Sequence, residues 1–366
     1  MRSRQRTAIT SLVATFLLRS AAGYSAATCP GNGSSLAFVT WGASLGCSPP
    51  VCGACQLTDI AGAAGALPVS LAARMPMFDT DAVRARMAGL RATFLGDSTM
   101  VETVHDLAIL LSGIGGDDPL LTSYKRQATR VSKDTRVCIP FRSEPAPRDL
   151  SFTPAANDGG TCADGTEVLF FQNHRSMRIR IPQLDFCLRF RFTGHHLQNQ
   201  DNGGTATFFQ PSFQAKLRRL IDSPCDDQRS DLLVVNSGRH DFIKPDTVGS
   251  PERYQSNLQR LSTLLEQVQA NGTTVLWRGN SGPWTLSGPQ WRESIPRSLM
   301  ASSNIPYIDV REVMEHVLLY YPLDCFASDV SHIGAIAYYH NESKSMLVSS
   351  MTTQKIIGGI FGALSR

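Results

Sequence analysis

Residues 91–99 read Arg-Ala-Thr-Phe-Leu-Gly-Asp-Ser-Thr, a short apolar run that ends in a glycine, an acid and a serine. An apolar run of this length that stops at glycine predicts a buried strand. From residue 99 to residue 111 the apolar residues recur at helical spacing. Ser98 is therefore expected at a strand-to-helix turn, at the carboxyl end of a strand, where open α/β sheets bind their ligands.

The same turn has a purely structural interpretation. Asp97 and Ser98 are both residue types that cap the start of a helix. A helix cap explains Gly96-Asp97-Ser98 as well as a nucleophile does, so the choice depends on the rest of the chain.

The rest of the chain alternates between strand and helix patterns. We expect helices over residues 80–87, 252–270 and 291–300, strands over 168–172, 186–192, 231–238, 273–277 and 305–310, and a candidate strand within 130–140. The apolar residues from Lys355 to Leu364 predict a helix that docks on this domain. The alternation predicts an α/β fold with a mostly parallel sheet that helices cover on both faces.

The strand expected over residues 186–192 has two distinct faces. Phenylalanine and leucine occupy its even positions, and Cys187, Arg189 and Arg191 occupy the odd positions. This alternation predicts a half-buried strand whose arginines face solvent or a substrate.

Composition indicates an ordinary globular protein with ample core, because 42% of the 366 residues are hydrophobic and 18% are charged. The formal net charge is +4, but four arginines lie within the first 19 residues. Without that segment the chain is near neutral, so the charge gives no reason to expect a nucleic acid or an anionic membrane as partner.

The N-terminal segment resembles a secretory signal. A basic start is followed by an apolar stretch from Ala8 to Leu18 and by small residues up to Ala27. The apolar stretch is too short to span a bilayer, so no stable membrane span is expected. We expect the Golgi lumen or the extracellular space. A plastid transit peptide is the alternative, because the first acidic residue is Asp59.

The chain has nine cysteines, and glycosylation sequons begin at Asn32, Asn271 and Asn341. Both features favour the secretory pathway. Residues 28–73 predict an irregular Cys/Gly-rich appendage between a signal peptide over 1–27 and a catalytic domain over 74–366. Disulfides are favoured over zinc for its clustered cysteines, because no second Cys-x-x-Cys follows. No metal site and no cofactor are expected.

A nucleophilic serine needs a base and an acid that orients the base. Asp329-Val330-Ser331-His332 offers both, because an acid three residues before a histidine can hold the ring in the required tautomer. Taken alone, this stretch is also explained by an N-cap aspartate with an incidental histidine. His240, beside Asp241, is an alternative base.

Asn236 follows a predicted buried strand and precedes Ser237-Gly238. Its amide is a candidate oxyanion donor at the edge of the sheet that carries Ser98, and a turn-forming asparagine is the alternative. Together the chain holds a serine, an amide, an acid and a histidine at strand ends or turns.

This set resembles the SGNH (GDSL) hydrolase superfamily, and the resemblance implies a three-layer α/β sandwich with a mostly parallel, flavodoxin-like sheet. Within it the chain resembles the PC-esterase group, which includes the trichome birefringence-like polysaccharide O-acetyltransferases. The resemblance covers roughly residues 75–345 and is carried by residues 75–79, residues 90–98, Asn236-Ser237-Gly238-Arg239-His240, residues 275–283, residues 308–310 and Asp329-x-x-His332.

The resemblance implies an acyl-serine enzyme in which Ser98, Asp329 and His332 are catalytic, with Gly96 and Asp97 in support. It implies an oxyanion hole that includes Asn236 and a second glycine. Gly194 is the candidate for that glycine, with residues 113–116 as rivals. Arg239, His240 and Arg278 are candidate substrate contacts, whereas His195 and His196 are expected to be loop residues or sugar contacts rather than metal ligands.

The expected activity is transfer of an acyl group, most simply acetyl, from an acyl donor to a carbohydrate hydroxyl. A secreted carbohydrate esterase with the same triad is one alternative, and a catalytically inactive glycan-binding protein is another. The plant family's Asp-Cys-x-His-Trp-Cys block is absent, and Cys325 precedes the acid. This departure leaves the substrate open, and the oligomeric state is not predicted.

Overall fold

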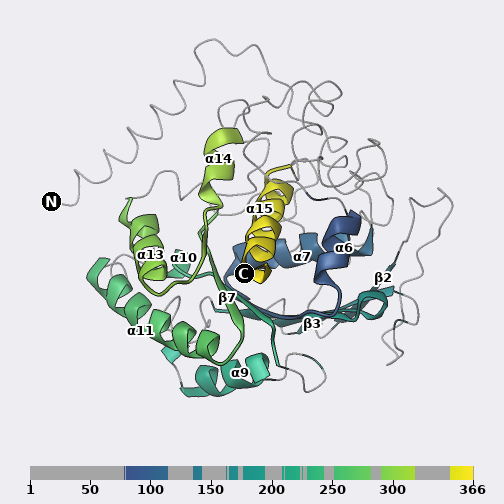
Figure 1. Cartoon of the computed structure of the whole chain (residues 1–366), viewed down its shortest axis with the longest axis horizontal. Coiled ribbons are helices and arrows are strands. Elements are labelled where there is room, and N and C mark those ends of the chain that lie inside the picture. Colours follow the sequence, from purple (N-terminus) through teal and green to yellow (C-terminus); the bar gives the residue numbers. More distant parts are fainter. Residues whose placement is uncertain are drawn as a thin grey trace, which may run out of the picture.

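Figure 1 shows the chain as a computed structural model. The structure describes residues 78, 80–113, 135–141, 162, 165–171, 176–193, 208–209, 211–222, 225, 229–242, 251–281, 290–317 and 347–365. The predicted leader and the predicted appendage of residues 28–73 lie outside the described residues.

A sheet of eight strands in the order β2-β3-β4-β5-β1-β6-β7-β8 forms the centre of the molecule. The strands are β1 Arg91–Gly96, β2 Thr135–Pro140, β3 Gly165–Phe171, β4 Ser176–Ile181, β5 Phe186–Phe192, β6 Leu232–Val235, β7 Thr274–Arg278 and β8 Tyr307–Ile308. Strands β5, β1, β6, β7 and β8 pair in parallel, whereas β2 to β5 pair antiparallel.

The parallel strands, numbered in chain order, lie as 2-1-3-4-5 across the sheet, which is the flavodoxin-like arrangement. The predicted α/β class with a mostly parallel sheet is therefore confirmed. The sequence analysis did not predict β4. Its apolar residues Met177, Ile179 and Ile181 alternate with polar ones, so a two-residue period was present in the sequence.

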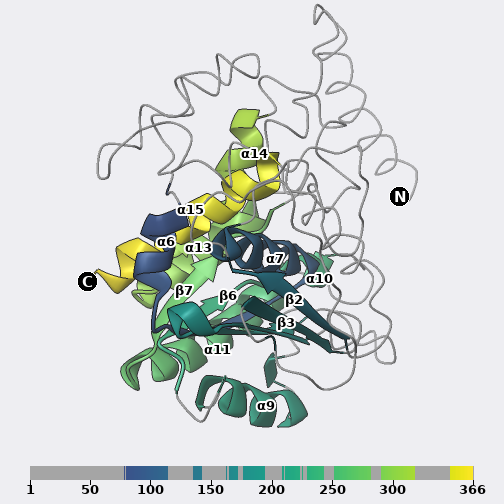
Figure 2. The ribbon, with the colours of Figure 1, turned by 90° about the vertical axis from the view of Figure 1, so that its right-hand side faces the viewer.

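Helices cover both faces of the sheet (Figures 1 and 2). Their bounds are α6 Thr80–Met87, α7 Ser98–Ser112, α9 Pro211–Asp222, α10 Arg239–Phe242, α11 Pro251–Ala270, α13 Trp291–Ser302, α14 Arg311–Val317 and α15 Leu347–Leu364. Residues of α6, α7, α14 and α15 share one apolar core with the sheet, and residues of α9, α11 and α13 share a second. The predicted helices over 80–87, 252–270 and 291–300 match α6, α11 and α13. The analysis missed α9, although Phe213, Leu217 and Ile221 recur every four residues.

Helix α15 confirms the predicted docking helix, and its contacts extend beyond apolar packing. The buried Gln354 side chain accepts a hydrogen bond from the Phe78 amide and donates one to the Phe78 carbonyl, both at 2.9 Å. Thr353 donates to Asp106 of α7 at 3.0 Å. The Gln354 bonds tie α15 to the segment that precedes α6, and the Thr353 bond ties it to α7, the helix that begins at Ser98.

Two disulfides lie among the described residues, Cys138–Cys162 and Cys187–Cys225. The second links β5 to the segment that follows α9. Both are compatible with the oxidising compartment that the leader predicts.

The two glycines Gly359 and Gly362 of α15 give a matched test of its packing. A Cβ atom at Gly359 would lie 2.6 Å from Ile308 Cγ1, whereas one at Gly362 would meet nothing within 4 Å. We expect Gly362→Ala to raise the free energy of unfolding by about 0.5–1 kcal/mol through helix propensity. Gly359→Ala is expected to lower it by about 1–2 kcal/mol, because overpacking against the stiff Ile308 outweighs that gain. Urea unfolding of both variants measures this, and equal effects would contradict the packing of α15 on β8.

The Cys187–Cys225 bridge closes a loop with a sequence separation of 38. We expect Cys187→Ser/Cys225→Ser to lower the free energy of unfolding by about 3–4 kcal/mol, because the unfolded chain gains entropy when the loop is opened. Urea unfolding under non-reducing conditions measures the loss. A double variant as stable as the parent protein would show that the bridge does not constrain the chain.

Candidate active site

Ser98 is the first residue of α7 and lies two residues beyond the end of β1. All six residues of β1 are buried, and the Ser98 side chain is half-buried. Asp97 between them is extended, with φ −87° and ψ −166°. The structure thus has the strand, turn and helix at the residues that the sequence predicted.

Asp97 caps α7. Its Oδ1 accepts hydrogen bonds from the Thr99 amide at 2.9 Å and from Thr99 Oγ1 at 2.7 Å. The helix-cap interpretation of this turn therefore holds for Asp97. Ser98 is the first residue of the helix and is not its cap. The cap fixes the backbone on both sides of Ser98, so capping and catalysis are compatible in this turn.

Gly96 lets three elements meet at the end of β1. A Cβ atom at this position would lie 2.6 Å from Met100 Cβ and 3.4 Å from Asn236 Cβ. A side chain here would push the first turn of α7 away from the sheet, so glycine is required by close packing.

Asn236 lies beside this turn on the neighbouring strand. Its backbone N–H donates to the Leu95 carbonyl at 2.8 Å, which continues the parallel pairing of β1 and β6 by one residue. In the flavodoxin-like order these strands flank the topological switch point, where ligands bind. Ser98 and Asn236 therefore share one edge of the sheet.

The Asn236 side chain is fully buried and turned toward the end of β7. Its Nδ2 atom donates to the Arg278 carbonyl and to Asn280 Oδ1, both at 3.2 Å. The amide would have to rotate before its N–H groups reached an oxyanion at Ser98. Its role as an oxyanion donor stays a prediction.

Arg278, at the end of β7, is 1% exposed and contacts the Ser98 turn from behind. Its guanidinium donates to Thr99 Oγ1 at 3.0 Å and to Ser281 Oγ at 2.7 Å. Burial lowers the pKa of Arg278, and the nearby Asp97 and Glu102 oppose this shift. An arginine stays charged in proteins, so a cation lies beneath the first turn of α7. The predicted substrate contact of Arg278 stays a prediction.

A polar network that the sequence analysis missed lies behind Asn236. Asn280 Nδ2 donates to the Ser237 carbonyl and to Glu293 Oε1, both at 3.4 Å, and the Tyr307 hydroxyl donates to Glu293 Oε2. Burial raises the pKa of Glu293, and the hydrogen bonds from Tyr307 and Asn280 oppose it. The position of Asn280 just after a predicted strand was the signal available for this network.

The turn after Asn236 depends on Gly238, which has φ +133°. A Cβ atom there would lie 2.7 Å from the Tyr254 hydroxyl oxygen. The turn leads into α10, whose first two residues, Arg239 and His240, are half-buried. The His240 ring packs edge-on against Phe192, with centroids 5.7 Å apart. Phe192 pairs with Gly96, so His240 also lies near the Ser98 edge.

The remaining predicted site residues lie outside the described residues. These are Asp329, His332, Gly194 and the rival glycines at 115 and 116. The base, its acid and the second oxyanion glycine therefore stay predictions. Gly113 is described and caps the C-terminal end of α7, about 22 Å along the helix from Ser98, so the structure does not place this rival beside Ser98.

The described part of the chain contains no group of three or more His, Cys, Asp or Glu residues that could hold a metal ion. Among its helices, none is both long enough and apolar enough to cross a membrane.

No family model matches this sequence, and no curated protein does. Solved structures with a similar trace include Axe2, an acetylxylan esterase from Geobacillus stearothermophilus, with 10% identity and a TM-score of 0.38, over 75% of this chain and 94% of that chain. LAE5, an α/β hydrolase from the metagenome of Lake Arreo in Spain, has 12% identity and a TM-score of 0.36, over 76% of this chain and 96% of that chain. At these scores the likenesses decide neither the family nor the activity of this chain.

The hydrogen bonds of Arg278 predict how its replacement by lysine changes the free energy of unfolding. A lysine at this position has a single nitrogen in place of the planar guanidinium, whose two terminal nitrogens donate separately to Thr99 and Ser281. We expect Arg278→Lys to lower the free energy of unfolding by about 2–3 kcal/mol, because buried hydrogen-bond partners are left unsatisfied.

Arg297→Lys is the matched control, because this exposed arginine pairs with Asp309 at the surface. Its effect should stay below about 1 kcal/mol. Urea unfolding compares the two variants. Equal effects would show that the Arg278 hydrogen bonds do not hold the turn.

Proposed function

We propose that the protein is a serine acyl-enzyme of the SGNH type that transfers O-acyl groups, most simply acetyl, to hydroxyl groups of a polysaccharide. The observation that carries this proposal is the position of Ser98. It begins α7 at the carboxyl end of β1 and lies beside Asn236 at the switch point of the sheet.

In the proposed reaction His332 removes the proton from Ser98 Oγ, and Asp329 holds the imidazole in the required tautomer. Ser98 Oγ attacks the acyl carbonyl carbon, and the carbonyl electron pair moves onto its oxygen. Collapse of this intermediate expels the donor's oxygen, which takes the proton from His332. An acceptor hydroxyl then loses its proton to His332 and attacks the acyl carbonyl carbon. The bond between Ser98 Oγ and the acyl carbon breaks, and Ser98 Oγ takes the proton back from His332.

The start of α7 is suited to stabilise the oxyanion. The first amides of a helix have no partner within the helix and carry a partial positive charge. The buried Arg278 guanidinium adds a full positive charge beneath the same turn. The Ser98 amide, a rotated Asn236 and Gly194 complete the proposed oxyanion hole. The loss of one donor costs about 2.7–4 kcal/mol in the barrier.

Arg278 is a positioning residue in this scheme. Its hydrogen bonds to Thr99 tie the end of β7 to the helix turn that carries Ser98. In this scheme its effect on the reaction passes through Thr99, whose hydroxyl and carbonyl oxygens accept its hydrogen bonds.

The choice of transferase over esterase rests on the resemblance to the polysaccharide O-acetyltransferases. The acyl-serine is common to both reactions, and only the acceptor differs. Incubation with 4-nitrophenyl acetate and an oligosaccharide acceptor separates the two, because a transferase acetylates the sugar whereas an esterase releases acetate. We propose the secretory pathway as its location, on the basis of the leader and the disulfides.

We expect Ser98→Ala and His332→Ala each to lower acyl turnover about 10⁴-fold or more while folding is retained, because the nucleophile and the base act as a unit. Release of 4-nitrophenol measures turnover, and circular dichroism checks folding. Ser302→Ala, an exposed serine on α13, is the matched control and should leave turnover unchanged.

A fluorophosphonate probe tests the alternative of an inactive glycan-binding protein. An active protein should be labelled at Ser98, and the label should be lost in Ser98→Ala and His332→Ala. Absence of labelling in the folded parent protein, or undiminished turnover in Ser98→Ala, would overturn the proposed function.

A further inference from the structure

The turn between α11 and β7 carries one of the three glycosylation sequons. Asn271-Gly272-Thr273 follows the last residue of α11 and precedes the first residue of β7. Asn271 and Gly272 are exposed, and Gly272 turns the chain with φ +91°. The other two sequons, at Asn32 and Asn341, lie outside the described residues. The Asn271 sequon is therefore the one whose surroundings the structure describes.

The side-chain amide of Asn271 has room for a substituent. Its Nδ2 atom donates to the Gln267 carbonyl at 2.8 Å, in a contact exposed to solvent. That bond uses one of the two N–H groups of the amide. Glu266 and Ala270 are exposed as well, and a Cβ atom at Gly272 would meet nothing within 4 Å among the described residues. A glycan on Nδ2 would therefore extend into solvent while the bond to Gln267 is kept.

Thr273, the third residue of the sequon, has the opposite environment. It is 1% exposed, and its Oγ1 atom donates to the Ser230 carbonyl at 2.9 Å and accepts from Arg229 Nε at 3.2 Å. The sequon requires this hydroxyl, because a serine or threonine two residues after the asparagine defines the acceptor. In the folded protein the hydroxyl is thus out of reach of an enzyme that reads the sequon.

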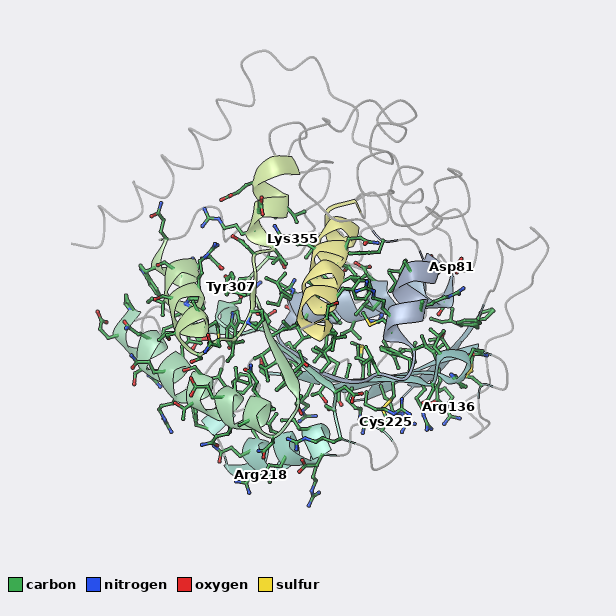
Figure 3. All side chains as sticks on the ribbon, in the orientation of Figure 1. Asp81, Arg136, Arg218, Cys225, Tyr307 and Lys355 are labelled. Carbon is green, nitrogen blue, oxygen red and sulfur yellow. A yellow bond between two sulfur atoms is a disulfide. The ribbon has the colours of Figure 1, made fainter. Side chains whose placement is uncertain are left out.

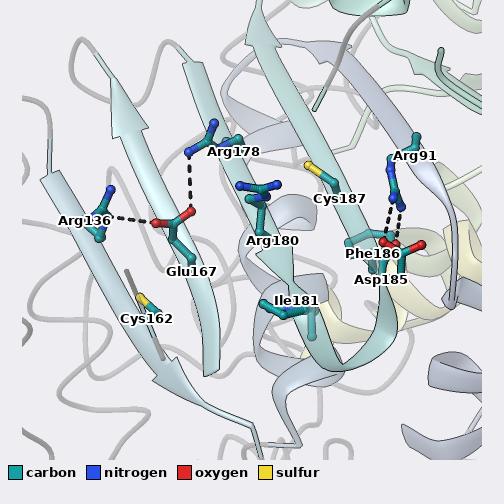
Figure 4. A pocket seen from close by; sticks show the side chains of 11 residues that line it. Arg91, Arg136, Cys162, Glu167, Arg178, Arg180, Ile181, Asp185, Phe186 and Cys187 are labelled. Atoms are coloured by element: carbon teal, nitrogen blue, oxygen red, sulfur yellow. Dashed lines mark hydrogen bonds and ion pairs between the residues drawn. The ribbon is translucent and has the colours of Figure 1, made fainter. Parts of the chain in front are cut away.

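The contacts around Thr273 belong to the edge of the sheet where the parallel strands begin. Thr274 donates its backbone N–H to the Asp231 carbonyl, and Asp231 donates its own to the Arg91 carbonyl, both at 2.8 Å. The Arg91 guanidinium forms an ion pair with Asp185 at 2.6 Å (Figure 4). The starts of β7, β6 and β1 and the turn before β5 are thereby joined. Thr273 therefore becomes buried when β7 pairs with β6.

A disulfide restrains the segment that supplies Arg229. Cys225 precedes Arg229 by four residues in the sequence and is bridged to Cys187 of β5. In Figure 3, Cys225 lies on the side of the sheet opposite Asp81 of α6. The contact from Arg229 to Thr273 therefore belongs to the oxidised, folded protein, and the same folding that forms the bridge closes the sequon.

The sequon and Ser98 lie at opposite edges of the sheet. Asn271 precedes the amino end of β7, whereas Ser98 follows the carboxyl end of β1, and the two strands run parallel through β6. Strand β7 has five residues and spans about 17 Å. A glycan on Asn271 would begin at the far edge and leave the Ser98 edge open.

We propose that Asn271 carries an N-linked oligosaccharide, which is added in the lumen of the secretory pathway before β7 pairs with β6. In this transfer Asn271 Nδ2 attacks the anomeric carbon of a lipid-linked oligosaccharide diphosphate. The bond between that carbon and the phosphate oxygen breaks, the lipid diphosphate leaves with the electron pair, and Nδ2 releases one proton to solvent. The inference rests on the proposed secretory location and not on the proposed acyl transfer.

Expression of the full chain in cultured mammalian cells tests the modification. We expect peptide N-glycosidase F to increase the electrophoretic mobility of the parent protein, and Asn271→Gln to carry one glycan fewer than the parent before digestion. Thr273→Ser should keep the glycan because it keeps the hydroxyl, whereas Thr273→Val should lose it with Asn271 still present. Digestion in heavy-oxygen water, followed by mass spectrometry, separates the aspartate left by glycan release from spontaneous deamidation.

Protein secreted into a bacterial periplasm tests the order of events, because it folds without the glycan. The folded, unmodified chain should not accept oligosaccharide from an oligosaccharyltransferase and its lipid-linked donor, since the Thr273 hydroxyl is buried. A short acceptor peptide in the same reaction shows that the transferase is active. Modification of Asn271 in the folded chain would overturn the proposed order.

An unmodified Asn271 in the protein from mammalian cells, or equal glycan numbers in the parent and in Asn271→Gln, would overturn the proposed modification. Turnover of 4-nitrophenyl acetate by Asn271→Gln should equal that of the parent, because the two sites lie at opposite edges. Loss of turnover in Ser98→Ala together with an unmodified Asn271 would reject the glycan and retain the acyl-enzyme. A glycosylated parent without turnover would do the reverse.

Discussion

The Ser98 turn depends on one buried cation. Arg278 carries its charge into the interior at the end of β7, where desolvation is costly and every hydrogen-bond partner matters. It donates to Thr99, and Thr99 in turn donates to Asp97. Three strand ends are thereby joined through side chains: β7 by Arg278, β1 by Asp97, and β6 by Asn236, whose amide bonds to the Arg278 carbonyl. These hydrogen bonds hold the backbone of the turn in place, because the loss of one would leave a buried polar group without a partner.

Close packing imposes the second constraint on this edge. Gly96 and Gly238 occupy positions where a side chain would overlap with Met100 and with Tyr254, respectively. The helix that follows Gly96 is buried from Thr99 to Ser112, so it has no solvent-exposed face along which to shift. The backbone of a nucleophile at the start of such a helix is fixed by the packing of the buried helix. Its own side chain is half-buried at the carboxyl edge of the sheet. Rigid support of this kind is what a preorganised site requires.

Elements whose apolar residues repeat regularly within one short stretch of sequence could be predicted from the sequence alone. The runs that form β1, β5 and α11 have uninterrupted apolar patterns, and their predicted bounds differ from the observed ones by a residue or two. The sequence was insufficient for β4, because three of its six residues are polar and its partners are set by pairing across the sheet. The burial of Arg278 was also beyond sequence reasoning, since a charged residue before a glycine resembles a surface turn. Its partner Thr99 is 179 residues away in the chain. The α/β alternation predicted a mostly parallel sheet, and the observed strand order places Ser98 and Asn236 at one edge of it.

The Gln354 and Thr353 contacts of α15 have a consequence for the order of folding. They join residues separated by 276 and 247 positions, so α7 is synthesised long before the helix that covers it. Until residue 354 has left the ribosome, Asp106 and the apolar residues around it lack their cover. Contacts between residues so far apart in the chain close the longest loops. Their loop-closure entropy cost is therefore the largest, and they form slowly. The helix of the proposed nucleophile therefore stays without its α15 cover during most of the synthesis of the chain.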